Sequence, residues 1–197
     1  MINSSSVSAR QDAIKRAQDI LKLNPVYIDT ETTGLKADDE IIEISIIDHD
    51  GTALLETLVK PGKPIPADAT RVHGITDRDV QTARAWPTVV WPQVRNLLLG
   101  RVMVFYNAEF DIRMMRQSLE RYKLPWKELW RENTHFFDLL KIYAQFRGEW
   151  DPNRRAYRYH SLAKAGADCN ISLPNAHRTT ADTLLTRALL HYVAESN

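Results

Sequence analysis

The chain has 197 residues, of which 44% are hydrophobic and 26% are charged, a composition typical of one domain with a sizeable core. Its formal net charge of +1 excludes a globally basic surface, so any nucleic-acid site has to be a local patch. One cysteine, Cys169, excludes an internal disulfide framework and a thiolate metal site. Since neither a secretory signal pattern nor a long apolar run is present, we expect a cytoplasmic protein with no membrane partner.

Residues 1–24 are predicted to form an extension that precedes a domain at 25–197. Met1–Ser8 is rich in serine and is expected to be mobile, whereas Arg10–Leu23 carries apolar residues at helical spacing until a proline ends the pattern. Acidic and basic side chains alternate on this helix, which argues against a targeting peptide. We expect the helix to pack against the domain, and a contact with a second copy or a partner protein is an alternative role.

Short strands come first in the domain, and helices and strands alternate in its second half. The strands of the first half are predicted to begin at Val26 and to span Ile41–Asp48 and Thr52–Val59. The later elements are predicted at Pro87–Leu99 (helix), Val102–Tyr106 (strand), Asn107–Tyr122 (helix) and Phe136–Asp138 (strand), with helices from about Leu139 and from His177 to the C-terminus. An antiparallel meander followed by alternating elements predicts an α/β domain with a mixed sheet flanked by helices.

The first strand carries two carboxylates where a buried strand would ordinarily carry hydrocarbon. Asp29 and Glu31 follow an apolar, β-branched run. Because a strand repeats every two residues, both side chains point from one face and lie roughly 7 Å or less apart. Two carboxylates so placed need a cation between them.

Two further acids are predicted to face inward from helices. At about 100° per residue, Asp111 falls on the apolar stripe of its helix, and Asp182 falls on the stripe of the last helix. Either acid alone is more simply read as a solvated carboxylate near a helix start, where the dipole favours it. Four inward acids together favour a metal site, and hard oxygen ligands favour Mg2+ or Mn2+ over Zn2+.

A base is available close to this site. His177 stands five residues before Asp182, just ahead of the predicted helix, so its imidazole can face the acids. A near-neutral pKa suits a group that takes a proton from an attacking water molecule. Alone, such a histidine would more simply be a solvent-exposed side chain.

These residues resemble the DEDDh 3′-to-5′ exonucleases, the proofreading-subunit type of the RNase H-like superfamily, over about residues 25–195. The matching motifs are Asp29-Thr30-Glu31-Thr32-Thr33-Gly34-Leu35, then Asn107-Ala108-Glu109-Phe110-Asp111, then His177 with Asp182. Their order, spacing and strand or helix context all agree with the family. The resemblance departs at Thr179, where many members carry alanine, and similarity to the oligoribonuclease branch is weaker.

The resemblance implies an RNase H-like mixed sheet and a two-metal hydrolase. Asp29, Glu31 and Asp182 would hold two divalent cations, Mg2+ or Mn2+, and Asp111 would ligate the second ion directly or through water. His177 would activate the hydrolytic water, and the product would be a nucleoside 5′-monophosphate. The segment Val72–Thr76 resembles the family's His-Gly-Ile-Thr loop near the terminal nucleotide, and Thr76–Asp79 also reads as a capping box.

The motifs also supply candidate substrate contacts. Those expected to bind the nucleic acid are Thr30, Thr32, Gly34, Leu35, His73, Ile75, Asn107 and Phe110.

The segment Phe146–His160 has the most distinctive local composition. Four arginines against two acids give it a local charge of +2, and Trp150, Tyr157 and Tyr159 lie among them. Arginines and aromatic rings together can track phosphates and stack bases of a single strand, so Arg154 and Arg155 are candidate substrate contacts. An equally weighted interpretation is a surface loop pinned by its aromatic residues, with solvated arginines.

The sequence therefore predicts a metal-dependent 3′-to-5′ exonuclease that degrades single strands, with DNA favoured and RNA as the second polymer. Two alternatives from other classes remain open: a nucleic-acid-binding module without catalysis, and a hydrolase of small phosphate compounds. Partners beyond single-stranded DNA or RNA, such as a second copy, a polymerase or a repair protein, are not determined by the sequence.

Overall fold

The computed structural model describes residues 4–126, 135–171 and 178–196. Its strands are β1 (Val26–Thr32), β2 (Ile41–Ile47), β3 (Ala53–Lys60), β4 (Arg84–Ala85), β5 (Val102–Phe105), β6 (His135–Asp138), β7 (Trp150–Asp151) and β8 (Ala156–Tyr157). Its helices are α1 (Ser4–Leu21), α2 (Ala67–His73), α3 (Asp77–Val80), α4 (Trp91–Leu98), α5 (Ala108–Glu120), α6 (Leu139–Arg147), α7 (Leu162–Asp168) and α8 (Thr179–Glu195). A π-helical turn, Trp86–Val90, leads directly into α4.

A mixed sheet of six strands forms the centre of the molecule, in the order β4-β3-β2-β1-β5-β6. The β1, β2 and β3 strands pair antiparallel, and β5 and β6 continue the sheet in parallel on the other side of β1. The predicted α/β class and the predicted order of meander and alternating elements are therefore confirmed. Hairpin β7–β8 forms a separate, two-stranded antiparallel sheet.

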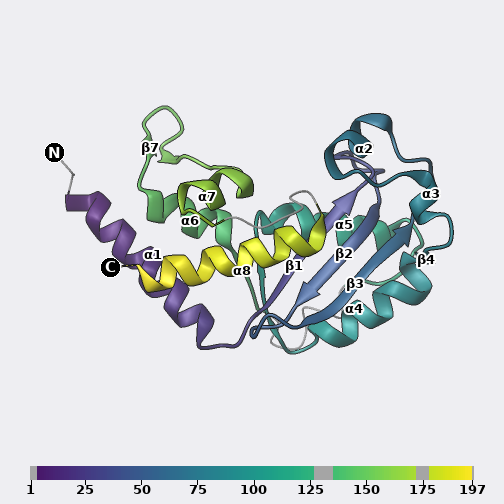
Figure 1. Cartoon of the computed structure of the whole chain (residues 1–197), viewed down its shortest axis with the longest axis horizontal. Helices are drawn as coiled ribbons and strands as arrows, with labels where there is room; N and C mark the ends of the chain where they lie inside the picture. Colours follow the sequence, from purple (N-terminus) through teal and green to yellow (C-terminus); the bar gives the residue numbers. More distant parts are fainter. Residues whose placement is uncertain (1–3, 127–134, 172–177, 197) are drawn as a thin grey trace.

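Helices cover both faces of this sheet (Figure 1). On one face α8 runs across the strands, and residues of α1, α6 and α8 share a core cluster with Tyr27 of β1. On the other face Met114 and Met115 of α5, with residues of α4, pack against Ile28 and Ile44. Strand β2 is buried along its whole length, as its isoleucine-rich sequence favours.

Helix α1 belongs to the first of these cores. The predicted helix is present but begins at Ser4, earlier than the predicted start at Arg10. Ile14, Ala17 and Ile20 are buried with residues of α8, as their spacing predicted. The division into an extension and a domain stays a prediction.

Sequence patterning missed short elements. Helices α2, α3 and α7 and strand β4 were not predicted, since elements this short show too little periodicity. The capping box predicted at Thr76–Asp79 is present and opens α3. The helix predicted to reach Tyr122 ends at Glu120, and Tyr122 is exposed rather than on the buried stripe of Asp111.

The strands β1, β5 and β6 run parallel, so the residues at their carboxyl ends, among them Asp29 and Asp138, lie at the same end of the sheet. Tyr27 is level with Val104, so two residues further on Asp29 is level with Tyr106, just past the end of β5. Phe105 is in turn level with Asp138 at the end of β6. None of the helices in the described ranges is long and apolar enough to cross a membrane.

Candidate active site

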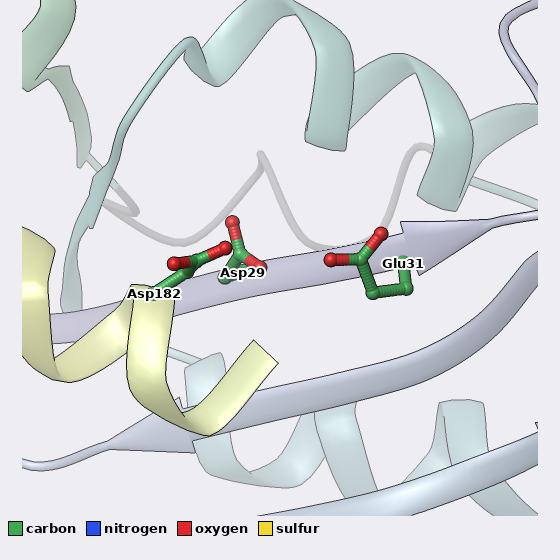
Figure 2. Close-up of side chains that lie close together, drawn as sticks. All are labelled: Asp29, Glu31 and Asp182. Atoms are coloured by element: carbon green, nitrogen blue, oxygen red, sulfur yellow. The ribbon is translucent and has the colours of Figure 1, made fainter. Parts of the chain in front are cut away.

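Three carboxylates meet where β1 passes the first turn of α8. Asp29, Glu31 and Asp182 each offer one oxygen atom, and these atoms all lie within 4.8 Å of one another. Figure 2 shows Asp182 reaching from its helix toward Asp29, with Glu31 further along the strand. We call these three residues the carboxylate cluster. The alternation of β1 and the opening turn of α8 thus place side chains far apart in sequence at one point, as the spacing of the acids predicted.

The carboxylate cluster is electrostatically costly without a counter-charge. Burial, followed by the nearby Asp182 and Glu43 carboxylates, raises the pKa of Glu31 to about 8. Burial and then the charges of Asp111 and Glu31 raise the pKa of Asp29 well above its ordinary value. These carboxyl groups do not readily ionise together unless a cation is bound between them. Hard carboxylate oxygens this close fit a site for Mg2+ or Mn2+. The residues present therefore suit the cations that the sequence predicts.

Asp111 lies beside the cluster, although it is not within the group that shares the 4.8 Å spacing. It is 2% exposed, and Thr30 Oγ donates a hydrogen bond of 2.7 Å to its carboxylate. Burial raises the pKa of Asp111 to about 7, while the bond from Thr30 opposes that rise. Thr30 points to the sheet face opposite Asp29 and Glu31, which is the face that α5 covers. It is therefore placed to orient Asp111 of α5, a role that sequence reasoning had not given it.

An ion pair that the sequence analysis missed anchors the start of α8. Glu43 of β2 is 2% exposed, and both of its carboxylate oxygens accept hydrogen bonds from the Arg178 guanidinium. The Thr179 backbone N–H donates a further bond of 3.2 Å to Glu43. Glu43 is directly opposite Glu31 in the β1–β2 register, so the pair fixes the first turn of α8 over the cluster. A lone acid within the isoleucine run of β2 was the available signal.

A second missed residue, Asp138, holds the start of α5. Its carboxylate accepts the backbone N–H of Asn107 at 3.1 Å and that of Leu140 at 3.1 Å. Asn107 occupies the N-cap position of α5 with a φ of 74°, a conformation that asparagine tolerates, and makes no side-chain cap bond. Asp138 therefore keeps the Asn107 turn, and with it Asp111, at the edge of the sheet.

A pocket of about 790 Å3 opens beside Glu31 and extends toward α2. Of the residues predicted to touch substrate, Thr32, Gly34, Leu35, His73 and Phe110 line it. We call it the α2 pocket. His73 is 5% exposed, and its Nδ1 accepts the Ile75 N–H at 3.0 Å. Because Nδ1 accepts this bond it carries no proton, so the ring proton is on Nε2. Burial lowers the pKa of His73.

The other predicted contacts lie elsewhere. Ile75 is 2% exposed and belongs to a small core cluster, so it supports His73 rather than lining the pocket. Asn107 is exposed at the start of α5, and Arg154 and Arg155 lie on the β7–β8 hairpin. His177 is outside the described residues, so its predicted role as the base stays a prediction.

Comparison with known proteins assigns the family. Residues 26–190 match the family model RNase T, described as Exonuclease. The chain belongs to the RNase T exonuclease family. Its resemblance to DEDD exonucleases and its class as a phosphodiester hydrolase are thereby confirmed, and this family of 3′-to-5′ exonucleases is typically metal-dependent.

Relatives of this exonuclease differ greatly in length. It is 39% identical over 191 residues to the uncharacterized exonuclease CP81 of Escherichia phage 186, covering 92% of this chain and 93% of that protein. It is 27% identical to DNA polymerase III PolC-type of Streptococcus pyogenes, covering 87% of this chain but 11% of the polymerase.

Solved structures support the fold of the exonuclease. E. coli exonuclease I, in complex with a dT13 oligonucleotide, superposes with a TM-score of 0.72 at 21% identity, covering 86% of this chain and 40% of that one. Exonuclease X, in complex with 5′-overhanging duplex DNA, superposes with a TM-score of 0.62 at 24% identity, covering 85% and 89%. The predicted mixed sheet with three antiparallel strands followed by parallel strands is the fold of these enzymes.

Proposed function

We propose that this exonuclease removes nucleotides one at a time from the 3′ end of single-stranded nucleic acid and releases nucleoside 5′-monophosphates. DNA is the favoured polymer, and RNA is the second candidate. The observation that carries the proposal is the carboxylate cluster at the mouth of the α2 pocket, because Glu31 belongs to both. A phosphodiester at the cluster would thus place one neighbouring nucleoside in the pocket and leave the other outside.

The residues of the site divide into ligands and positioning groups. Asp29, Glu31 and Asp182 would hold two divalent ions, with Asp111 completing the ligand set directly or through water. When bound, the ions would supply positive charge that stabilises the negative charge developing on the phosphodiester oxygens. Thr30 orients Asp111 through its hydrogen bond of 2.7 Å.

His177 is proposed to accept a proton from the attacking water molecule. The water oxygen forms a bond to phosphorus as the bond to the 3′ oxygen of the preceding nucleotide breaks. The shortened strand keeps a 3′-hydroxyl, and the released nucleotide keeps the 5′-phosphate. The Glu43–Arg178 pair supports Asp182, since it fixes the start of α8.

The α2 pocket fits a terminal nucleoside by its size and lining. A volume of about 790 Å3 is within the range of ligand pockets. Phe110 and Leu35 offer apolar surface to a base or sugar, and the ring of His73 forms part of the wall. The co-crystallised oligonucleotide of the structurally similar exonuclease I supports a single strand as the ligand class.

Product analysis tests this proposal. Purified protein is incubated with unlabelled single-stranded DNA in Mg2+, in Mn2+ or in EDTA, beside an Asp29→Asn variant. We expect chromatography to show nucleoside 5′-monophosphates only for the unaltered protein with a divalent ion. Hydrolysis of a nitrophenyl ester of thymidine 5′-phosphate with no release of nucleotides from DNA would instead indicate a hydrolase of small phosphate compounds.

A further inference from the structure

The β7–β8 hairpin follows α6 and takes no part in the chemistry described so far. Its strands are paired through Trp150 and Tyr157, whose rings meet edge to face with centroids 5.3 Å apart. Asp151 accepts the backbone N–H groups of Asn153 at 3.0 Å and Arg154 at 3.2 Å, which shapes the turn. The hairpin is therefore an ordered element rather than an unstructured loop.

The base of the hairpin is tied to the catalytic edge of the sheet. Tyr106 Oη donates a hydrogen bond of 2.7 Å to the backbone carbonyl of His160. Tyr106 is level with Asp29 on the neighbouring strand, and its side chain belongs to the core cluster on the α8 face. Tyr27 belongs to the same cluster. Because Tyr27 is two residues before Asp29 on β1, the side chain of Asp29 points to that face as well. The chain leaving the hairpin thus passes on the same face of the sheet as the carboxylate cluster.

The surface of the hairpin has the chemistry of a single-strand binding site. Asp151, Arg154, Tyr157, Arg158 and Tyr159 line a hollow of about 370 Å3. Tyr159 is 54% exposed, so its ring is available to a base. Arg155 and Arg158 are exposed, and within the described ranges neither forms a salt bridge. Cations beside an exposed aromatic ring can bind phosphates while the ring stacks on a base.

The hairpin and the α2 pocket lie on opposite sides of the α8 N-terminus. In Figure 1 the green segment with β7 and α7 is to the left of that end of α8, and α2 is to its right. A strand whose last nucleoside fills the α2 pocket, and whose adjacent phosphodiester lies at the cluster, would leave the site on the hairpin side.

We propose that the β7–β8 hairpin binds the nucleotides on the 5′ side of the scissile phosphodiester, with Tyr159 stacking on a base and Arg155 and Arg158 contacting phosphates. This inference rests on the proposed function for the polarity of the strand. It makes activity depend on substrate length, because a dinucleotide is too short to reach the hairpin while a 12-mer is long enough.

Kinetics on these two lengths test the inference. The variants are Tyr159→Ala and the pair Arg155→Ala with Arg158→Ala, and the control is Lys15→Ala with Arg16→Ala, which removes the same charge from α1. We expect KM for the 12-mer to rise about tenfold in Tyr159→Ala, in line with the usual strength of base stacking. The arginine pair should lower the salt slope of log KM by about 1.4. Neither change should alter kcat or the dinucleotide KM, and the control should match the unaltered protein.

Anisotropy of a labelled 12-mer in EDTA separates failure of this inference from failure of the proposed function. Weaker binding by the hairpin variants would support the hairpin site, whether or not the unaltered protein cleaves either substrate. If the unaltered protein cleaves neither substrate, only the proposed function is overturned. Equal affinity, KM and salt slope in the variants and the control would overturn the hairpin site, including the case in which the hairpin binds a protein instead.

Discussion

Neutralising Glu31 should stabilise the metal-free protein, although it removes a side chain of the active site. Glu31 has a pKa of about 8 in the folded chain and 4.5 as its ordinary value. A carboxyl group with a raised pKa contributes most to stability below its unfolded pKa, and that contribution is lost as the pH rises toward the folded pKa. Between the ordinary pKa of 4.5 and the folded pKa of about 8, ionisation of Glu31 therefore opposes folding of the unaltered protein. Glu31→Gln removes this cost because glutamine carries no charge.

The magnitude follows from the two pKa values. Linkage gives a difference in unfolding free energy between Glu31→Gln and the unaltered protein of about 1 kcal/mol at pH 5 and about 4 kcal/mol at pH 8. Because Glu31 is partly exposed, solvent screening reduces these values, and we expect about 2–4 kcal/mol at pH 8. Bound Mg2+ should reverse the order, since it stabilises the folded protein that retains the full ligand set.

Urea denaturation between pH 5 and pH 8, in EDTA and in Mg2+, measures these differences. The control is Glu120→Gln, which neutralises a carboxylate that is 62% exposed on α5 and 3.8 Å from Arg116. We expect the control to stay within about 0.5 kcal/mol of the unaltered protein at every pH. A Glu31→Gln protein that is no more stable than the unaltered one in EDTA at pH 8 would refute the reasoning.

Three other substitutions test separate parts of the site. Thr30→Val should lower kcat about tenfold by releasing Asp111, whereas Thr30→Ser should retain activity; equal rates would show that the hydrogen bond has no role. Arg178→Ala should cost about 3–5 kcal/mol of unfolding free energy in urea because it leaves the buried Glu43 unpaired, and Arg178→Lys should cost less; an unchanged urea midpoint would contradict this. His177→Ala should lower kcat by about 10²- to 10⁴-fold while leaving Mn2+ binding, measured by calorimetry, unchanged. A loss of ion binding in that variant would instead make His177 a ligand.

The elements and acids of the site were predictable where periodicity was strong. Asp29 and Glu31 stood out because carboxylates interrupted an apolar strand, and Asp182 because it continued the apolar stripe of a long helix. The mixed character of the sheet followed from the meander and the later alternation of helices and strands. Longer elements carry enough repeats for such patterns to be distinct.

The supporting contacts were not predictable, because they join residues distant in sequence through geometry that no local pattern encodes. The pair Glu43–Arg178 depends on the β1–β2 register and on the path into α8. The roles of Thr30 and Asp138 depend on how α5 packs against the ends of β1 and β6. Ile75 was expected at the substrate because it belongs to a motif, but its side chain is buried and its backbone N–H bonds to His73.

The central claim is cleavage from the 3′ end at the carboxylate cluster, and one gel tests it most directly. Matched single-stranded DNA and RNA oligomers, labelled at the 5′ end or the 3′ end, are incubated with Mg2+ and either the unaltered protein or Asp29→Asn. We predict a ladder of successively shorter 5′-labelled products and immediate release of labelled mononucleotide from 3′-labelled strands, for the unaltered protein alone. Internal cuts, a ladder from the 5′ end, or equal activity of Asp29→Asn would contradict the account.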